Sequence, residues 1–260
     1  MNKLICINDI EMEYVQFGTG EKAMVMMPGI GLSKIVSSAD AIETAYKPYA
    51  KDYTVYVFDR PNTLKKGTTI EEIADDFITV FKALNLKDIY LFGVSYGGML
   101  SQHIAIKAPE LIKKLCLTST ISKATEDVYN SLNEWRKNCS TNTIKELTED
   151  MLDRIYTPEL ISANRDNLIA FFSGTSKKEI DHFLIQLESA MYHNVYDNLD
   201  KITCPTLVVC SRNDKVFKYS DYEMLINKLN CDFYSYAKAS HALYDEEPAF
   251  KGILFNFFNN

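Results

Sequence analysis

The feature of this sequence that most constrains its fold is the pentapeptide Gly93-Val94-Ser95-Tyr96-Gly97. A short apolar run typical of a buried strand, 89–92, precedes it, and apolar residues at helical spacing follow it over 97–109. A chain that leaves a strand and enters a helix within so few residues must turn sharply, and small residues on both sides of the turn relieve the crowding. The spacing therefore predicts a strand, a tight turn that raises a serine hydroxyl above the sheet, and a helix.

Strand-like and helix-like runs alternate through most of the chain, which is typical of an α/β fold. Helical patterns occupy 38–50 and 69–85, and Thr69 and Glu72 can form a capping box at the start of the second. The segment 18–20, Gly-Thr-Gly, is interpreted as a hairpin turn between the second and third strands. The expected strands are 4–7, 11–17, 23–27, 53–59, 89–92, 113–119, 205–211 and 231–237.

The alternation stops from about Ile121 to Leu199, where no convincing strand occurs. Four helical patterns fill this segment, at 125–139, 143–156, 158–172 and 176–192. A helical insertion over the carboxyl edge of a parallel sheet commonly covers a ligand cleft. We expect a mostly parallel, eight-stranded α/β sheet with an antiparallel start, helices on both faces and a helical cap. The expected segments are 1–120 and 200–260 for the core and 121–199 for the cap.

Composition and charge disfavour several classes of partner. The 35 acidic and 28 basic side chains give a net charge of -7, which disfavours nucleic acid and anionic membrane surfaces. No stretch approaches the 18 apolar residues of a transmembrane helix, and the N-terminal segment lacks the apolar core of a signal peptide. We expect a cytoplasmic protein that acts on a small molecule, and the sequence leaves its oligomeric state open.

The cysteines and histidines indicate neither disulfides nor a metal site. The chain contains no C-x-x-C, and no cluster of His, Cys and Asp has metal-ligand spacing, so no metal and no organic cofactor is expected. Most cysteines lie in apolar strand-like runs, and we interpret them as buried free thiols in a reducing compartment. The six are Cys6, Cys116, Cys139, Cys204, Cys210 and Cys231.

Ser95 needs a base, because a serine hydroxyl is a poor nucleophile until a neighbouring group takes its proton. His241 is the candidate, since it follows the last expected strand, where a loop at the carboxyl end points into the same crevice as Ser95. His103 lies two turns into the helix after Ser95, cannot fold back onto it and is expected to be structural. His182 and His193 lie in the insertion, where either could line a pocket or serve as an ordinary helix residue.

An imidazole that acts as base needs an acceptor that fixes its tautomer. Asp214 follows the penultimate strand, and one helix and one strand fit between it and His241. The chain order Ser95, Asp214, His241 is the order used by one known fold. Asp245 and Glu246 are the rival carboxylates, although they also suit the acidic first turn of the last helix.

The turn at Ser95, the positions of Asp214 and His241 and the alternating strands and helices together resemble the α/β-hydrolase superfamily in its capped, single-domain branch. The resemblance implies that Ser95 is the nucleophile, His241 the base and Asp214 the acid. The other place where the superfamily can put its acid, after the sixth strand at “LTSTIS”, has no carboxylate. The matching stretches cover essentially the whole chain outside the insertion and read “MVMMPGIGLS”, “YTVYVFDRPN”, “TIEEIADDFITVFKALNLKDIYLFGVSYGGMLSQHIAIKAPELIKKLCLTST”, “ITCPTLVVCSRNDKVF” and “SHALYDEEPAFKGILFNF”.

The tetrahedral intermediate of such an enzyme carries an oxyanion that needs two donors. One is expected to be the backbone N–H of Tyr96, at the positive end of a helix. The resemblance places the other at Ile30 N–H, with Gly31 as the alternative and as a substrate contact. The superfamily usually has His-Gly-x here, and that histidine ties the loop down by hydrogen bonds. Pro28 replaces it in this chain, which makes the geometry of the loop an open question.

Three further departures concern the same region of the expected site. The stretch “FDRPNTLKKG” stands where relatives often carry Asp-x-Arg-Gly-x-Gly-x-Ser. Ser240 precedes His241, where glycine is common. Tyr96 is less usual than methionine after the nucleophile, and its hydroxyl is able to reach the pocket.

The expected function is cleavage of a small-to-medium uncharged ester or related acyl bond through an acyl-enzyme on Ser95. One alternative is a carbon–carbon hydrolase or an acyltransferase with the same triad, and a second is a non-catalytic ligand-binding protein of this fold. The candidate substrate contacts in the insertion are Trp135, Phe172, Tyr192 and His193, for which cap-to-core packing is the alternative interpretation.

Overall fold

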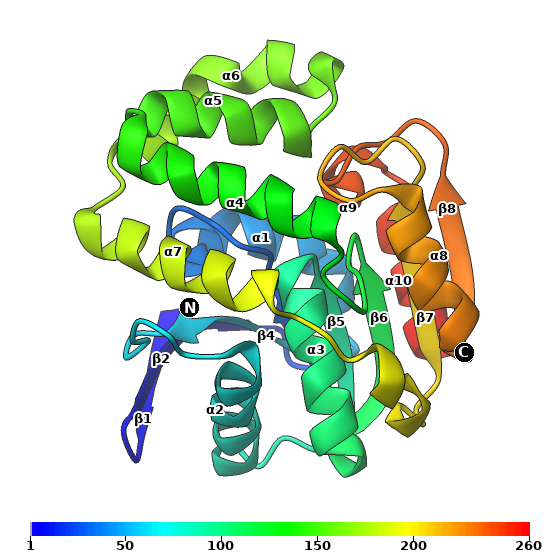
Figure 1. Ribbon diagram of the computed structural model, residues 1–260. Helices are drawn as coiled ribbons and strands as arrows, with labels where there is room; N and C mark the ends of the chain where they lie inside the picture. Colours follow the sequence, from blue (N-terminus) through cyan, green and yellow to red (C-terminus); the bar gives the residue numbers. More distant parts are fainter. Residues whose placement is uncertain (1) are drawn as a thin grey trace.

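The computed structural model describes residues 2–260, and a single sheet lies at its centre (Figure 1). The strand order is β1-β2-β4-β3-β5-β6-β7-β8. The β1–β2 and β2–β4 pairs are antiparallel and every other neighbouring pair is parallel, so the predicted fold class is confirmed. The strands are β1 (Asn2–Ile7), β2 (Ile10–Phe17), β3 (Lys22–Met27), β4 (Tyr53–Pro61), β5 (Ile89–Val94), β6 (Ile112–Thr118), β7 (Thr206–Ser211) and β8 (Asp232–Tyr236).

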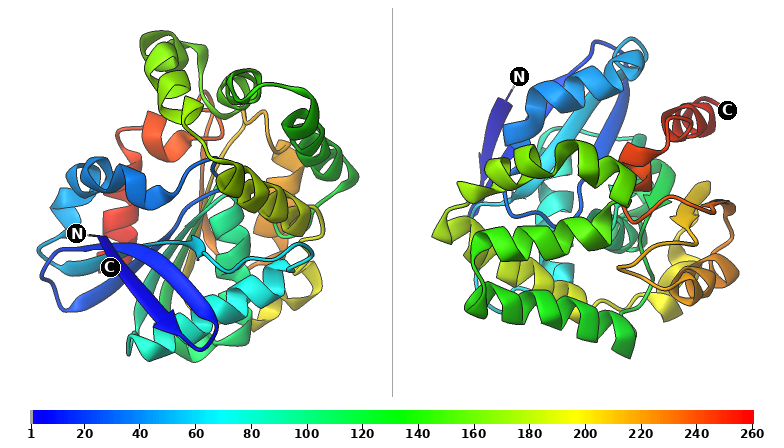
Figure 2. Two further views of the ribbon diagram at one scale, coloured as in Figure 1. Left: turned by 90° about the vertical axis from the view of Figure 1, so that its left-hand side faces the viewer. Right: turned by 90° about the horizontal axis from the view of Figure 1, so that it is seen from above.

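Helices cover both faces of the sheet (Figure 2). The longer of the helices that cover the two faces are α1 (Ala39–Tyr46), α2 (Ile70–Ala83), α3 (Tyr96–Lys107), α8 (Tyr219–Lys228) and α10 (Phe250–Asn259). Shorter helical turns are η1 (Ile35–Ser38), η2 (Lys47–Tyr49), η3 (Pro109–Leu111), η4 (Tyr196–Lys201) and α9 (Leu243–Glu246). Because a strand alternates its side chains, Met24 of β3 joins the core beneath α1 and α10, and Val25 joins the core beneath α2 and α3. This two-sided burial explains why the central strands have no polar face.

Local chemistry explains why 69–85 folds as the sequence predicts. The Thr69 hydroxyl accepts the N–H of Glu72, and the Glu72 carboxylate accepts the N–H of Thr69, which forms the expected capping box. The apolar residues at helical spacing form one buried face, which packs on the sheet: Ile70, Ile73, Ala74, Phe77, Ile78, Val80 and Phe81.

The predicted hairpin at 18–20 is wrong. β2 pairs with β1 and β4, whereas β3 lies on the far side of β4 and runs parallel to it. The segment 18–20 therefore crosses over, and the N–H of Thr19 donates to Ala50 O at 2.9 Å in the connection before β4. The hairpin at this end of the chain joins β1 and β2 instead, and Asn8 supplies its positive φ of 51°.

The four helical patterns of the insertion are all helices. They are α4 (Glu126–Thr141), α5 (Ile144–Ile155), α6 (Pro158–Ser173) and α7 (Lys177–Met191), and they lie between β6 and β7 in the chain. In Figure 1 they stand together above the end of the sheet at which β5 leads into α3. Within residues 2–260, no helix is long and apolar enough to cross a membrane.

All six cysteines are free thiols. Cys116 and Cys210 are buried in the central strands, as the sequence predicts. Cys6 is exposed, so the interpretation as a buried thiol is wrong for this residue. The reason is that β1 is an edge strand, whose side chains are only partly covered.

Two buried histidines join α3 to the segment that follows α7. The Nε2 of His103 lies 3.2 Å from Nδ1 of His193, whose Nε2 donates to Ile121 O at 3.0 Å. Because a carbonyl only accepts, Nε2 of His193 carries a proton, and in the neutral ring Nδ1 then accepts from Nε2–H of His103. Burial is the largest cause that lowers the pKa of His103 to about 4 and that of His193 to about 3.

This pair makes the fold sensitive to acid. The unfolded pKa of histidine is about 6.5, so below that pH the unfolded state binds more protons and the free energy of unfolding falls. Between pH 7.5 and pH 5 the free energy of unfolding should fall less in His103→Gln, which keeps a donor at the position of Nε2, than in the wild type. We expect the difference to be about 2 kcal/mol. Urea unfolding of both proteins at the two pH values measures this, and equal losses would contradict it.

Candidate active site

The predicted turn at Ser95 is present. β5 ends at Val94, α3 begins at Tyr96, and Ser95 between them has φ 51° and ψ -117°, a conformation that costs a non-glycine residue energy. A Cβ on Gly97 would lie 2.0 Å from Met27 O, and only glycine fits so close to the backbone of β3. Gly97 therefore lets β3, β5 and α3 meet at the serine.

Hydrogen bonds from β6 and the residues after it hold this turn in place. The N–H of Ser95 donates to Thr118 O at 2.9 Å, and the Thr120 hydroxyl donates to Ser95 O at 2.7 Å. The backbone N–H and C=O of the strained residue are thus both paired with β6 or with the segment that follows it. The surrounding structure fixes the direction of the side chain, as a strained position requires.

The side chains of Ser95, His241 and Asp214 form one hydrogen-bonded chain. Nε2 of His241 lies 2.9 Å from Oγ of Ser95, and Nδ1 lies 2.7 Å from Oδ2 of Asp214. The side chains of His241 and Asp214 are 6% and 0% exposed. A carboxylate only accepts, so it assigns the proton of the neutral ring to Nδ1 and leaves the lone pair of Nε2 facing the serine hydroxyl.

Asp214 is buried but fully hydrogen-bonded. Its Oδ1 accepts the backbone N–H groups of Val216 at 2.7 Å and Phe217 at 3.0 Å. Its Oδ2 accepts from the Tyr222 hydroxyl as well as from His241. Burial, followed by the Asp214 charge, raises the pKa of Tyr222 well above its usual value, so the phenol remains a donor. Sequence reasoning missed Tyr222, because its spacing on α8 is that of any core aromatic residue.

The rival carboxylates after His241 have other roles. Glu246 accepts the N–H of Thr157 at 2.5 Å and that of Ser240 at 2.7 Å. Asp245 accepts from the Tyr156 hydroxyl at 3.4 Å, and desolvation raises its pKa to about 6. The structure therefore places Asp214, and neither of these residues, on the imidazole.

The loop that carries His241 is bonded directly to the insertion. The N–H of Ala242 donates to Ile155 O at 2.9 Å, and the Ser240 hydroxyl donates to the same carbonyl. From the core side, the Ser119 hydroxyl donates to His241 O at 2.6 Å. The serine that replaces the usual glycine before His241 thus supplies one of the bonds between the imidazole loop and α5.

Both residues expected to supply oxyanion donors line the cavity beside Ser95. Tyr96 is the first residue of α3, where backbone N–H groups have no partner within the helix. Gly29 packs against the serine, since a Cβ on it would lie 3.3 Å from Ser95 Cβ, and Ile30 follows it into the cavity beside the serine. Gly31 does not reach this cavity, because it faces Arg60 in a neighbouring pocket.

A small, mostly apolar cavity of about 50 Å³ adjoins Ser95 and His241. Residues of the core and of the insertion both contribute to its wall. The wall comprises Gly29, Ile30, Ser95, Tyr96, Met99, Leu132, Trp135, Ile155, Ala190, Val216, Phe217, His241 and Tyr244. The Tyr96 hydroxyl is engaged with the Ser189 hydroxyl at 2.7 Å, and burial raises the pKa of this tyrosine. No group of His, Cys, Asp and Glu within the described residues 2–260 could hold a metal ion.

Of the substrate contacts predicted in the insertion, only Trp135 lines this cavity. Phe172 stacks edge-on against Phe171 on α6, Tyr192 is 75% exposed, and His193 is buried against His103. The structure thus places these three residues away from this cavity. Apolar spacing shows that a helix has a buried face, but not which part of that face lies over the serine. Leu132 and Ile155 were missed for the same reason.

The sequence and the fold agree with known proteins. A sequence model of the α/β hydrolase fold matches residues 22–248, and the chain belongs to that family. It is 24% identical over 205 residues to RutD of Serratia proteamaculans, a protein named as a carbamate hydrolase, covering 74% of this chain and 75% of that one. It is 23% identical over 227 residues to the human serine hydrolase BPHL, covering 81% and 69%.

Solved structures show the same fold. An α/β hydrolase enzyme, MGS-M2, from a Medee basin deep-sea metagenome library superimposes with a TM-score of 0.88 at 20% identity, over 99% of this chain and 98% of that one. Together with the named relatives, this supports a hydrolase of the α/β fold.

The strain at Ser95 gives a prediction that is independent of any reaction. Ser95→Gly relieves a positive φ that Ser95→Ala retains, and relief of about 1–3 kcal/mol outweighs the roughly 0.5–1 kcal/mol that glycine loses in chain entropy. We expect the glycine variant to be more stable than the alanine variant by about 1 kcal/mol, or roughly 2–4 °C in Tm. Thermal unfolding of the two variants measures the difference, and an alanine variant of equal or greater stability would show that the turn is unstrained.

Proposed function

We propose that this protein is a serine hydrolase that cleaves a small-to-medium uncharged ester or a related acyl bond. The observation that carries the proposal is the hydrogen-bonded chain Ser95–His241–Asp214, which opens into an apolar cavity. Ser95 is the proposed nucleophile, His241 the base and Asp214 the acid that orients it. The backbone N–H groups of Tyr96 and Ile30 are the proposed oxyanion donors.

The reaction follows from the tautomer that Asp214 imposes. Oγ of Ser95 attacks the acyl carbon while Nε2 of His241 takes the hydroxyl proton, and the carbonyl electrons move onto the oxygen between the two N–H donors. The imidazolium returns that proton to the leaving alcohol as the C–O bond breaks, which leaves an acyl-enzyme. Water then attacks with His241 again as base, and the carboxylic acid and free Ser95 result.

The cavity supports the proposed substrate class. Leu132, Trp135, Ile155 and Val216 give it an apolar wall, and no side chain among its lining residues carries a fixed charge. Such a wall favours an uncharged acyl group, because burial of an unpaired charge is costly. The free cysteines suit a reducing compartment, and we infer a cytoplasmic location.

Two variants test the roles of the triad. We expect Ser95→Ala to abolish hydrolysis of nitrophenyl acetate and butyrate, and Asp214→Asn to lower the rate by roughly 10³- to 10⁴-fold, because asparagine allows the wrong histidine tautomer. A fluorophosphonate probe should label Ser95 stoichiometrically in the wild type and not at all in His241→Ala, with intact mass as the readout.

Three results would contradict the proposal. A tenth of the wild-type rate in Ser95→Ala would remove the serine from the role of nucleophile. Folded wild-type protein that the probe does not label would favour a ligand-binding protein. Turnover confined to vinylogous diketones in a panel of esters, thioesters, lactones and carbamates would indicate a carbon–carbon hydrolase.

Trp135 tests the part of the insertion in substrate choice. Its indole N–H donates to Asp150 at 2.9 Å and its ring lines the cavity, so Trp135→Ala should lengthen the space for the acyl chain. We expect the kcat/KM ratio of nitrophenyl octanoate to acetate to rise at least tenfold, with Trp135→Phe close to wild type. An unchanged ratio would mean that this wall does not select the acyl chain. Deletion of the whole insertion is a poorer test, because it also removes the Ile155 carbonyl that accepts hydrogen bonds from the loop of His241.

A further inference from the structure

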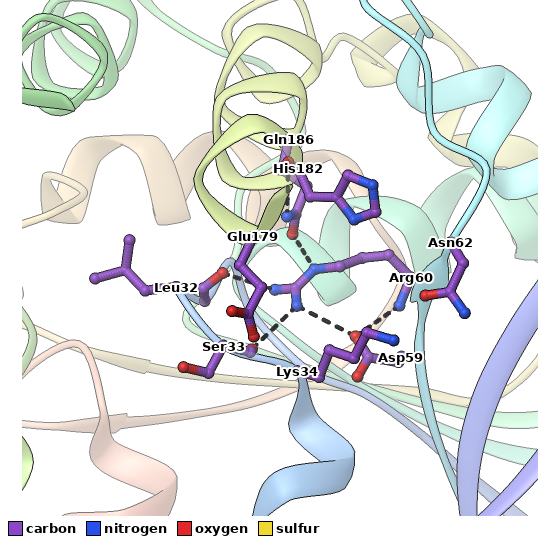
Figure 3. A pocket seen from close by; sticks show the side chains of 10 residues that line it. Leu32, Ser33, Lys34, Asp59, Arg60, Asn62, Glu179, His182 and Gln186 are labelled. Atoms are coloured by element: carbon purple, nitrogen blue, oxygen red, sulfur yellow. Dashed lines mark hydrogen bonds and ion pairs between the residues drawn. The ribbon is translucent and has the colours of Figure 1, made fainter. Parts of the chain in front are cut away.

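A single guanidinium holds the loop that contains the proposed oxyanion donor Ile30. Arg60, at the carboxyl end of β4, places Nη2 3.3 Å from Gly29 O and 3.4 Å from Gly31 O, and Nη1 3.4 Å from Ser33 O. Figure 3 shows the side chain extended between β4 and α7, with its fork turned toward the loop. Three alternate carbonyls of the segment 29–33 thus converge on one cation.

The remaining donors of Arg60 fix the guanidinium itself. Nη1 also lies 3.3 Å from Oδ1 of Asp59, and Nε donates to Oε1 of Gln186 on α7. Gln186 is fully buried and its amide donates to His182 O at 2.9 Å, so its own orientation is set within α7. An arginine has five N–H donors, and these contacts use all of them.

Planarity of the peptide bond turns this contact into an effect on the proposed oxyanion donor. The carbonyl of Gly29 and the N–H of Ile30 belong to one peptide unit, and in a trans peptide they point to opposite sides. A bond that draws the Gly29 oxygen toward Arg60 therefore turns the Ile30 N–H away from Arg60, in a loop whose Gly29 packs against Ser95. A cation on the carbonyl also polarises the peptide and makes its N–H a stronger donor.

Burial and charge favour this positioning role over a contact with substrate. The Arg60 side chain is 12% exposed, and Asp59, which balances its charge, is 2% exposed. The space beside them is about 10 Å³, enough for one water molecule and not for an acyl or alcohol group. Hydrogen bonds to a charged donor in such a partly dehydrated place are stronger than at the surface.

We infer that Arg60 is a positioning residue that aims and polarises the Ile30 N–H, and that Gln186 anchors it to the insertion. This inference rests on the proposed function. Arg60 would then hold the loop in place of the usual histidine, because Pro28 has neither a backbone N–H nor a side-chain donor with which to hold it. Lysine cannot replace Arg60, since a point charge lacks the planar fork that reaches several carbonyls at once.

The test compares Arg60→Lys with a matched control, Arg165→Lys. Arg165 pairs with Asp153 on the outer side of the insertion, so the control makes the same chemical change away from the loop. Loss of one oxyanion donor costs roughly 10²- to 10³-fold in rate, and a misaligned donor retains part of that. We expect Arg60→Lys to lower kcat on nitrophenyl butyrate roughly 10- to 100-fold with KM within threefold of wild type, and Arg165→Lys to change neither.

A transition-state analogue separates positioning from general damage. An alkyl trifluoromethyl ketone adds Oγ of Ser95 and forms an oxyanion in the same place, so its Ki should rise by the factor by which kcat/KM falls. Gln186→Leu, which removes only the anchor, should give a smaller change of the same kind. A rise in KM without a fall in kcat, or a Ki that stays at the wild-type value, would overturn the role of Arg60.

Hydrogen exchange decides the question even where Arg60→Lys is poorly active or the protein is not a hydrolase. Exchange of the 29–33 amides, followed by mass spectrometry, should be faster in Arg60→Lys at a Tm within a few degrees of wild type, and unchanged in Arg165→Lys. Unchanged exchange in Arg60→Lys would show that Arg60 does not hold the loop. If the wild-type protein fails to react with fluorophosphonate but Arg60→Lys still shows the faster exchange, the proposed function is refuted. The same result would show that Arg60 holds the loop.

Discussion

The close approach of Gly97 to the backbone of β3 is the constraint on which the rest of the site depends. It brings the start of α3 within van der Waals contact of Met27 O and leaves Ser95 at a positive φ between them. The loop that follows β3 must then pass directly over the serine, which is where Gly29 and Ile30 lie. One steric condition thus sets the direction of the hydroxyl and the position of the proposed oxyanion loop.

The acid side of the site depends on satisfying a buried carboxylate. The side chain of Asp214 has no exposed surface, and an unpaired charge there would destabilise the fold by several kcal/mol. The turn after β7 provides two backbone N–H groups, α8 provides the Tyr222 hydroxyl, and the loop after β8 provides His241. Proper folding of three separate elements is therefore coupled to the geometry of the imidazole.

Local patterns in the sequence predicted the parts of this structure that local physics decides. The strand–turn–helix at Ser95, the cap at Thr69 and the four helices of the insertion each depend on neighbours within a few residues. The hairpin prediction at 18–20 was wrong because strand pairing is decided by tertiary contacts, here by the placement of β4 between β2 and β3. Arg60 was missed because most of its partners are distant in the chain, and Tyr222 because its spacing on α8 is that of any core aromatic residue.

The insertion is bonded to both loops that adjoin the serine, which limits how it can act. Ile155 O accepts from Ser240 and Ala242 beside the imidazole, and Gln186 accepts from Arg60 beside the proposed oxyanion loop. A lid that swung away as a rigid body would break these bonds and disturb the groups that a hydrolase needs fixed. The proposed substrate selection by the insertion and the alignment of the proposed catalytic groups therefore belong to one packed structure, and two of the departures from the superfamily, Pro28 and Ser240, lie where its bonds are made.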